Sequence, residues 1–291
     1  MRPGEPAPPV RSKMTPTALL RRALAEPRLR GVSVDSGRFV DLHRQILHEK
    51  PVMRAVFQEF YAAILRADAR YFSAPGRRVE LGAGSSLFGD LHPEVLSTDI
   101  KRGGHLKAVV DAQSLPFRRH AVRAYYGIDC FHHFPDPARF FGELVELLPP
   151  GGGCVLIEPY HGPLAKLFYE RLFETERFDR SQRGWTTKSS GPMTGANQAL
   201  SYVVFTRDAK EFSARYPELE LLAQVPMTNY PRYVLSGGLN FRSLIPARMA
   251  GAVRLAERVM APLAGWLALH HLIVLRKRPG PASSGEAGGR S

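Results

Sequence analysis

Cysteine is nearly absent from this chain. Its 291 residues include two, Cys130 and Cys154, and both lie in apolar runs that we interpret as strands. Two such thiols build neither a disulfide framework nor a cysteine-rich metal site. We therefore expect reduced, buried thiols and a cytoplasmic protein.

Long hydrophobic runs are also missing. The most apolar stretch covers residues 259–275 and is interrupted by Pro262 and Gly265. It is shorter than the about 20 residues that a membrane-spanning helix needs. The N-terminus is basic and rich in proline, without the apolar core of a signal peptide. We expect neither an export signal nor a transmembrane segment.

Acidic residues are outnumbered by basic ones. The chain has 40 Lys and Arg against 27 Asp and Glu, a formal charge of +13. Such a charge can attract nucleic acid, anionic lipid or an acidic substrate. The basic residues are scattered rather than gathered in a stripe, and no nucleic-acid-binding module is recognisable. Nucleic-acid binding is therefore not favoured.

Short apolar runs alternate with helical patterns between residues 77 and 160. This alternation is typical of parallel βαβ units. In such sheets, ligands bind beyond the carboxyl ends of the strands. Polar residues stand at each of these predicted ends: Glu80, Asp99, Asp111, His132-His133 and Glu158.

A glycine turn follows the first predicted strand, in Glu80-Leu-Gly-Ala-Gly84. Gly82 can adopt backbone angles that other residues avoid, and Gly84 lets a ligand approach the main chain. A dinucleotide-binding turn would need a third glycine at position 87, which is Leu87. The turn alone is equally compatible with an ordinary strand-to-helix connection.

Five segments in order resemble class I S-adenosylmethionine-dependent methyltransferases of the methyltransferase-11-like, Rossmann-like superfamily. They are Glu80-Leu-Gly-Ala-Gly, the acid Asp99, Asp111-Ala-Gln-Ser-Leu-Pro-Phe117, Phe131-His-His-Phe-Pro-Asp136, and Pro150-Gly-Gly-Gly-Cys-Val-Leu-Ile-Glu158. Ser86 departs from the family, since many members have a third glycine there.

The resemblance implies an α/β fold with a Rossmann-like, seven-stranded, mostly parallel sheet and helices on both faces. It also implies S-adenosyl-L-methionine as cofactor. Gly82 and Gly84 would then lie against its methionine part, with Glu80 near the ammonium group. Asp99 would accept hydrogen bonds from both ribose hydroxyls. Asp111 would accept a hydrogen bond from the adenine amino group, and Ala112 would lie against the adenine ring. The remaining predicted cofactor-binding residues are Ala83, Ile100 and Asp129.

His132 and His133 are the candidate catalytic residues. On an extended segment, adjacent side chains point to opposite sides, so we expect one histidine in the cofactor cleft. It could accept a hydroxyl proton, or both could only shape the pocket. Adjacent histidines on a strand cannot share an ion, so no metal site is expected. Cys130, on the same predicted strand face as His132, is interpreted as a buried thiol rather than a nucleophile.

The acceptor is expected to be a small or medium organic molecule, with O-, N- or C-methylation left open. A scaffold that binds the cofactor without catalysis is an alternative. Acceptor recognition is expected in the segment after the fifth strand; its candidates are Tyr160, His161, Trp185, Asn197, Gln198 and Tyr202.

An amphipathic helix is predicted over residues 248–269. Its apolar stripe is interpreted as core packing. The alternative is that Arg248, Arg254 and Arg258 dock it peripherally on an anionic membrane, which suits a lipid-like acceptor.

The predicted organisation is one methyltransferase domain over residues 15–278 between disordered tails, 1–14 and 279–291. The oligomeric state is left open. Within the domain we expect N-terminal helices (15–72), a cofactor-binding core (77–160), an acceptor-side insertion (161–218), and C-terminal strands with the amphipathic helix (219–278).

Overall fold

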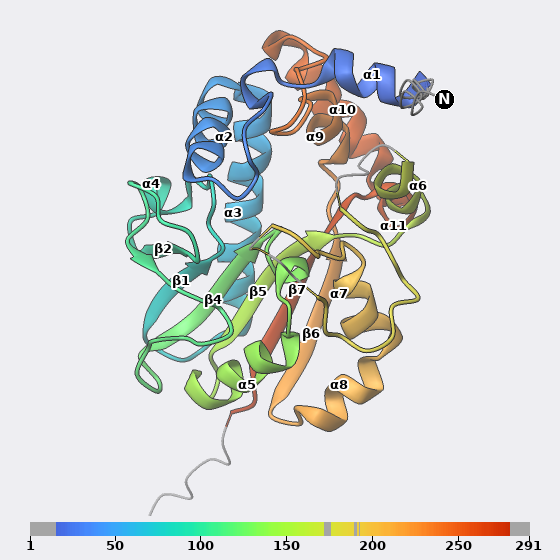
Figure 1. The fold of residues 1–291 in the computed structure, drawn as a ribbon. Helices are drawn as coiled ribbons and strands as arrows, with labels where there is room; N and C mark the ends of the chain where they lie inside the picture. The colour runs from blue at the N-terminus through green and yellow to red at the C-terminus, as the bar shows by residue number, and fades with distance from the viewer. Residues whose placement is uncertain (1–15, 172–175, 189–190, 192, 280–291) are drawn as a thin grey trace, which may run out of the picture.

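The computed structural model describes residues 16–171, 176–188, 191 and 193–279. Apart from Pro279, the predicted disordered tails lie outside the described residues. The described chain forms a seven-stranded sheet in the order β3-β2-β1-β4-β5-β7-β6 (Figure 1). This confirms the predicted α/β fold.

Six of the seven strands run in one direction, and β7 runs in the opposite one. β7 pairs antiparallel with both β5 and β6. β5 is buried along its whole length, as expected for a strand covered on both faces. The strands are β1 (Arg77–Leu81), β2 (Val95–Asp99), β3 (Ala108–Val109), β4 (Val122–Ile128), β5 (Gly153–Pro159), β6 (Leu219–Pro226) and β7 (His270–Lys277).

One face of the sheet is covered by the N-terminal helices α2 (Gly37–Glu49) and α3 (Pro51–Tyr71), which follow α1 (Pro16–Leu24). Ser36 caps α2, because its Oγ accepts a hydrogen bond from the Phe39 amide at 3.3 Å. α3 buries Phe60 and Ile64 in the same core as strand residues of β4, β5 and β7.

The other face carries α5 (Pro137–Leu147), α7 (Leu200–Tyr202), a π-helical turn (Val203–Arg207) and α8 (Ala209–Arg215). Asp136 caps α5 by accepting a hydrogen bond from the Ala138 amide at 3.1 Å. The core on this face is aromatic and includes Phe131, Phe140, Phe141, Phe205 and Phe212.

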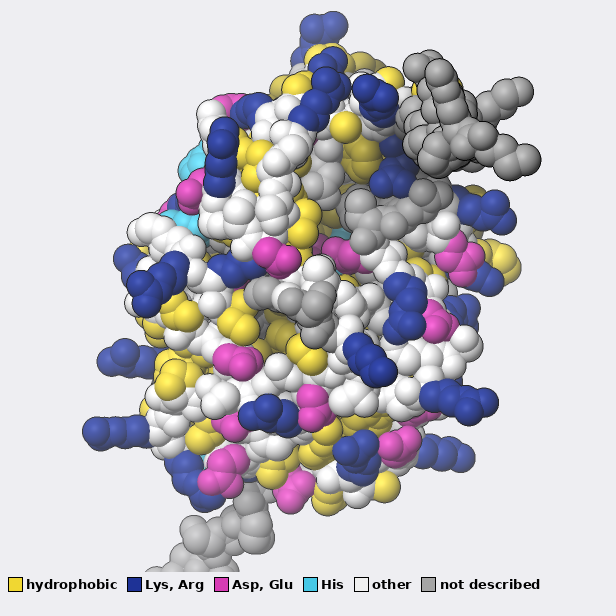
Figure 2. Space-filling model, in the orientation of Figure 1, with side chains coloured by type: hydrophobic (Ala, Val, Ile, Leu, Met, Phe, Trp, Pro, Cys, Tyr) yellow, Lys and Arg dark blue, Asp and Glu magenta, His cyan; other side chains and the backbone are white. Residues whose placement is uncertain are grey.

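The remaining helices lie toward one end of the molecule. α4 (Phe88–Leu91) follows the glycine turn, and α6 (Pro163–Arg171) follows β5. α9 (Tyr230–Leu235), α10 (Ala250–Met260) and α11 (Ala264–Leu267) gather with α1 and α6 at the upper right of Figure 1. Basic side chains are spread over the whole visible face in Figure 2, in line with their scatter in the sequence.

The predicted helix over residues 248–269 is divided. 3-10 turns at Ala247–Met249 and Ala261–Leu263 flank α10. The predicted apolar stripe is only partly core: Met260 and Leu267 are half-buried against the core that contains Tyr169 and Tyr230, but Met249 and Leu263 are exposed. The fully buried residue of α10 is Glu257. No helix in the described part of the chain is both long and apolar enough to cross a bilayer.

Candidate functional site

A cavity of about 500 Å³ lies beyond the carboxyl ends of β1, β2 and β4. It has the size of a small-molecule site. Eight of the nine residues predicted to bind the cofactor line it, which brings together positions up to 47 residues apart. They are Gly82, Ala83, Gly84, Asp99, Ile100, Asp111, Ala112 and Asp129.

The glycine turn forms one wall of this cavity. Gly82 and Gly84 have φ values of 59° and 51°, in the left-handed region that favours glycine. A Cβ atom at Gly82 would lie 2.6 Å from Cβ of Cys130, so a side chain there has no room. Burial raises the pKa of the Cys130 thiol well above its ordinary value, which suits a packing residue and not a nucleophile.

Asp99 ties the glycine turn to the end of β2. Its Oδ2 accepts a hydrogen bond from the Gly84 amide at 2.8 Å, and its Oδ1 accepts one from the Lys101 amide at 2.8 Å. Each carboxylate oxygen has a second lone pair, so the side chain can still accept hydrogen bonds from a ligand. Asp111, which accepts a hydrogen bond from the Gln113 amide at 2.8 Å, stands in the same wall.

Glu80 is the predicted cofactor residue that does not line the cavity. It is 1% exposed, and Ser97 Oγ donates a 2.6 Å hydrogen bond to its carboxyl. Burial raises the pKa of Glu80 to about 7, with hydrogen bonds from Ser86 and Ser97 opposing the shift. Its carboxyl is thus held behind the turn.

Asp129 is the carboxylate that both faces the cavity and sits on unusual backbone. Its φ of 50° is uncommon for a residue with a side chain. Its Oδ1 lies 3.3 Å from Nε2 of His270, at the start of β7. The residue stands where β4 ends and the chain turns toward the histidines.

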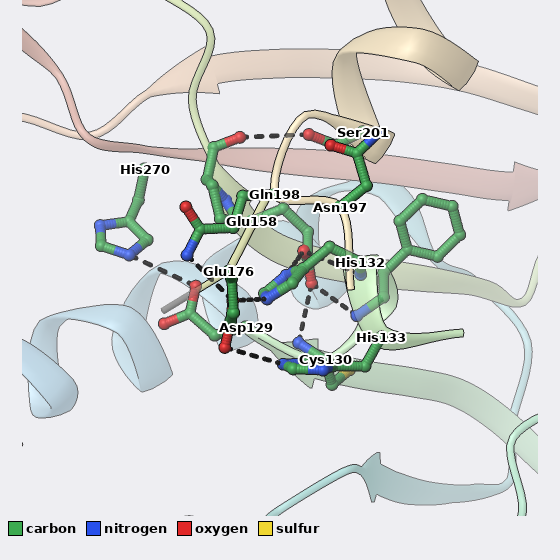
Figure 3. A network of polar contacts seen from close by, with 12 residues as sticks. Asp129, Cys130, His132, His133, Glu158, Glu176, Asn197, Gln198, Ser201 and His270 are labelled. Atoms are coloured by element: carbon green, nitrogen blue, oxygen red, sulfur yellow. Dashed lines mark hydrogen bonds and ion pairs between the residues drawn. The ribbon is translucent and has the colours of Figure 1, made fainter. Parts of the chain in front are cut away.

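The two candidate histidines lie on a 3-10 turn, Phe131–His133, and not on an extended segment. The prediction that they point to opposite sides is therefore wrong. Their ring centroids are 4.3 Å apart, and both rings approach Glu176 (Figure 3). Nε2 of His132 lies 3.3 Å from Glu176, and Nε2 of His133 lies 3.7 Å from it.

Glu158, at the end of β5, stabilises this turn through hydrogen bonds to its backbone amides. Its carboxylate accepts hydrogen bonds from the amides of Cys130 and Phe131 at 3.0 and 2.8 Å. Its Oε2 is 2.6 Å from Nδ1 of His132. The glutamate is fully buried and His132 is 3% exposed, so this pair is shielded from water.

Near neutral pH the His132 ring is protonated and the His133 ring is not. Burial opposes protonation of His132, but Glu158 and Glu176 outweigh it and raise the His132 pKa well above its ordinary value. Burial and the neighbouring His132 cation lower the pKa of His133 to about 4. Burial would raise the pKa of Glu176, but the hydrogen bond and charge of His132 dominate and lower it to about 2. His133 is thus a neutral imidazole beside a buried ion triad.

The same arrangement changes the prediction about metals. The ligating nitrogens of both histidines and a carboxylate oxygen of Glu176 lie within 4.8 Å of one another. The argument that adjacent histidines cannot share an ion is wrong for this chain, because a helical turn places both rings on one side. These donors could hold a divalent cation.

A second cavity, of about 150 Å³, adjoins the first. Asp129 and His133 line both cavities. The rest of its wall is largely apolar: Met53, Phe57, Pro159, Phe168, Tyr169, Met193, Tyr233 and Leu239. Besides Asp129 and His133, its polar lining residues are His43, His132, Glu176, Gln198, Asn240 and His270.

The predicted acceptor residues lie elsewhere, apart from Gln198. Trp185 is 4% exposed in the aromatic core, with Nε1 donating to Asp208 at 3.0 Å, so its predicted acceptor role is wrong. Asn197 is also wrongly predicted: it is fully buried, and its side chain hydrogen-bonds the backbone of Asp179 in both directions. Neither Tyr160 nor His161 lines the two cavities; their rings lie 4.5 Å apart.

No sequence motif indicates that two polar residues, Glu176 and His270, belong to the site. Glu176 belongs to no motif and lies between a helix and a loop. His270 opens an apolar strand, where a histidine is commonly a packing residue. Glu158 is different, since its position at the end of a predicted strand already placed it at the ligand edge.

A family model described as a methyltransferase domain matches residues 79–156, from β1 into β5. No curated protein sequence matches the chain.

Solved structures extend the likeness at low identity. A Haemonchus contortus phosphoethanolamine N-methyltransferase 2, in complex with S-adenosyl-L-methionine, is 14% identical, with a TM-score of 0.44 and 87% of this chain covered. The chain spans 59% of the length of that protein. A geranyl diphosphate C-methyltransferase from Streptomyces coelicolor is 15% identical, with 88% of this chain and 89% of that chain covered and a TM-score of 0.43. A Mesorhizobium loti S-adenosylmethionine-dependent methyltransferase is 15% identical, with 74% and 96% covered and a TM-score of 0.42.

Proposed function

Because residues 79–156 match a methyltransferase-domain family model, we propose that this chain is a class I S-adenosylmethionine-dependent methyltransferase whose two cavities have separate roles. The 500 Å³ cavity takes the cofactor, and the adjoining 150 Å³ cavity takes the reacting part of a small or medium organic acceptor. Methyl transfer between them needs both ligands held in line.

The larger cavity fits the cofactor in three respects. Gly84, on left-handed backbone in the cavity wall, leaves open space where a side chain would project. Asp99 and Asp111 provide carboxylate oxygens at neighbouring strand ends. Asp129, in place of Glu80, is the carboxylate that lines the wall near the histidines and suits a cationic group. When bound, the cofactor supplies an electrophilic methyl group on a sulfonium.

His133 is the proposed proton acceptor. It lines both cavities, its Nδ1 is buried, and among the described residues that nitrogen has no hydrogen-bond partner. With a pKa lowered to about 4, the ring is unprotonated near neutral pH and free to take a proton from the acceptor. Glu176, 3.7 Å from its Nε2, stabilises the resulting imidazolium.

His132 acts as a positioning residue in this proposal. Its Nδ1 is engaged by Glu158 at 2.6 Å, and its cationic ring balances the carboxylate of Glu176. The observation that carries the proposal is the neutral His133 ring, which lines both cavities and whose Nδ1 has no hydrogen-bond partner in the described part of the chain. An acceptor with an apolar body and one ionisable group matches that wall.

The test combines binding and transfer. We expect calorimetry to detect S-adenosylhomocysteine binding, and a labelled methyl group to pass from the cofactor into a component of a small-molecule extract. His133→Asn should slow transfer roughly a hundredfold or more while cofactor affinity changes little. The matched control is His48→Asn, at an exposed position on α2, which should behave as wild type.

Three outcomes would count against parts of the proposal. Binding without transfer into any extract would favour the non-catalytic scaffold. Equal transfer by wild type and His133→Asn would remove the proton-acceptor role. Loss of transfer with a chelator, restored by a divalent metal, would replace that role with a metal site at His132, His133 and Glu176.

A further inference from the structure

α10 and α11 expose three large apolar side chains to solvent. Leu255 is 62% exposed, Val259 is 75% exposed and Trp266 is 68% exposed. Among the large apolar side chains that the structure describes, these three are the most exposed. Exposed apolar groups gathered on one segment mark an interaction surface.

The inward side of α10 is ionic instead. Glu257 is 4% exposed and accepts hydrogen bonds from the backbone and Nε of Arg232 at 2.9 and 2.7 Å. Nη2 of Arg232 also donates to Glu59 on α3 at 2.7 Å. Position 257 is two residues from 255 and from 259, so it faces the opposite side of the helix. Val253 and Met260 flank this ion pair and are half-buried, whereas Leu255 and Val259 face solvent, so α10 buries one charge and leaves part of its apolar surface outside.

The charge around the apolar side is of one sign. From residue 243 to residue 269 the sequence has one acid, Glu257, and that acid is buried. Arg248, Arg254 and Arg258 are exposed on the same segment. Arg254 is 3.0 Å from Glu59, so Arg248 and Arg258 contribute most of the positive charge at the rim. Apolar side chains with a basic rim are complementary to an anionic lipid surface.

A second copy of the chain fits this surface less well. A two-fold interface packs the same patch against itself. It would bring the arginines of one α10 toward those of the other, with no exposed acid on the segment to pair with them. The indole of Trp266 also suits the boundary between headgroups and acyl chains.

A third cavity lies near this end of the molecule and next to the histidine cavity. An apolar cavity of about 170 Å³ is lined by Leu20, Leu24, Phe241 and Leu244, near the end of the molecule where α10 lies. It shares four wall residues with the 150 Å³ histidine cavity: Phe168, Tyr233, Gly237 and Gly238.

We propose that the α10–α11 surface, with Leu255, Val259 and Trp266 at its centre and Arg248 and Arg258 at its rim, docks on an anionic membrane. The helix lies flat in the headgroup region with its apolar side toward the acyl chains. This docking does not depend on the identity of the methyl acceptor.

Vesicle flotation of the full chain tests the proposal. We expect flotation with vesicles that contain phosphatidylglycerol, little with phosphatidylcholine alone, and less with the anionic vesicles at high salt. Leu255→Ser/Val259→Ser/Trp266→Ser should weaken binding at least roughly tenfold. Each of Arg248→Gln and Arg258→Gln should weaken it about fivefold and flatten its salt dependence.

Tryptophan emission provides a second readout. The chain has two tryptophans, and Trp185 is buried, so a blue shift on adding anionic vesicles reports Trp266. The control is Leu91→Ser/Val109→Ser, which removes two exposed apolar side chains near β2 and β3. It should float as wild type does.

Absence of flotation with anionic vesicles at low salt would overturn the proposal. It would also fall if the triple variant floated as well as wild type. A wild-type dimer in solution that the triple variant converts to a monomer, without vesicle binding by either, would assign the surface to a second copy instead.

Discussion

Two adjacent histidines differ in charge, one cationic and one neutral, because their partners differ. His132 lies between Glu158 and Glu176 and is a cation. His133 shares only the more distant Glu176, and burial together with the His132 cation keeps it neutral. One residue type thus provides a fixed charge and a proton acceptor at neighbouring positions, which is how perturbed pKa values separate roles at a site.

Glu80 gives a prediction about stability at the scale of one residue. Its pKa is about 7 in the folded protein against 4.5 in the unfolded chain, so folding favours the protonated carboxyl. The stabilisation is full below about pH 4.5 and is lost as the pH rises through about 7, a change of about 3 kcal/mol. Glu80→Gln mimics the protonated form and does not titrate. We expect it to gain about 2 to 3 kcal/mol relative to wild type between about pH 5 and pH 8.

Urea unfolding at the two pH values measures this difference. Glu218→Gln, at an exposed position before β6, is the control and should show the same free-energy difference from wild type at both. A pH-independent difference for Glu80→Gln would show that burial does not shift this carboxyl.

Helices and strands that follow from local sequence patterns could be predicted, but the residues at which they end could not. The β1 turn and the α5 start follow from glycine, proline and capping residues near in sequence. The sequence predicts a strand that ends at His132-His133, but β4 ends at Ile128. The chain turns there because Glu158, from the next strand, binds the amides of Cys130 and Phe131. Glu158 is 28 residues from Cys130 and 27 from Phe131, so no local sequence pattern predicts these hydrogen bonds.

The orientation of α10 has the same kind of cause. Its apolar stripe favoured core packing in the sequence. The buried pairing of Glu257 with Arg232 on α9 fixes which side of the helix faces inward, so Met260 is partly buried while Leu255 and Val259 face solvent. Since an unpaired buried charge is costly, this distant ion pair outweighs the local apolar pattern.

The glycine turn supplies a prediction at the scale of an element. Gly82→Ala and Gly84→Ala both place a Cβ on left-handed backbone, at a cost of roughly 1 to 2 kcal/mol. At Gly82 that Cβ also meets Cβ of Cys130 at 2.6 Å, whereas at Gly84 the nearest atom is 3.9 Å away. We expect Gly82→Ala to lower the free energy of unfolding clearly more than Gly84→Ala does.

Chemical denaturation of the two variants side by side checks the order. Gly251→Ala, on α10 with open space around its Cβ, should be neutral or slightly stabilising. Equal losses for Gly82→Ala and Gly84→Ala would mean that the turn relaxes away from Cys130.

At the scale of the whole molecule, the α/β sheet and the clustering of acids at its edge could be predicted. The alternation of strands with helices, and the acidic residues at the strand ends, are both visible in short stretches of the sequence. The acceptor side could not. Trp185 and Asn197 stand in a polar stretch that looks like an exposed loop. Their burial depends on α5, α8 and the 176–182 segment folding around them.

Cofactor binding should stabilise the whole molecule by mass action. S-adenosylhomocysteine at a hundred times its dissociation constant adds about 2.7 kcal/mol, which should raise the melting temperature by roughly 5 to 10 °C. Asp99→Ala removes the carboxylate that holds Gly84 and faces the cavity, so most of this rise should disappear.

Thermal melts with and without the ligand measure the rise for each variant. Asp41→Ala, at an exposed position on α2, is the control and should keep it. A full rise in Asp99→Ala would place the ligand away from the end of β2.

The buried contact between His132 and Glu158 also provides a probe for local opening of the structure. The proton on Nδ1 of His132 lies in a 2.6 Å pair of which neither partner is appreciably exposed. The amide of Asn197 donates to the carbonyl of His132 at 3.2 Å, and Glu176 lies against the ring. This proton therefore exchanges with deuterium only when the segments bearing Glu176 and Asn197 open. Its exchange rate reports how often the wall of the histidine cavity opens, before any acceptor has been identified.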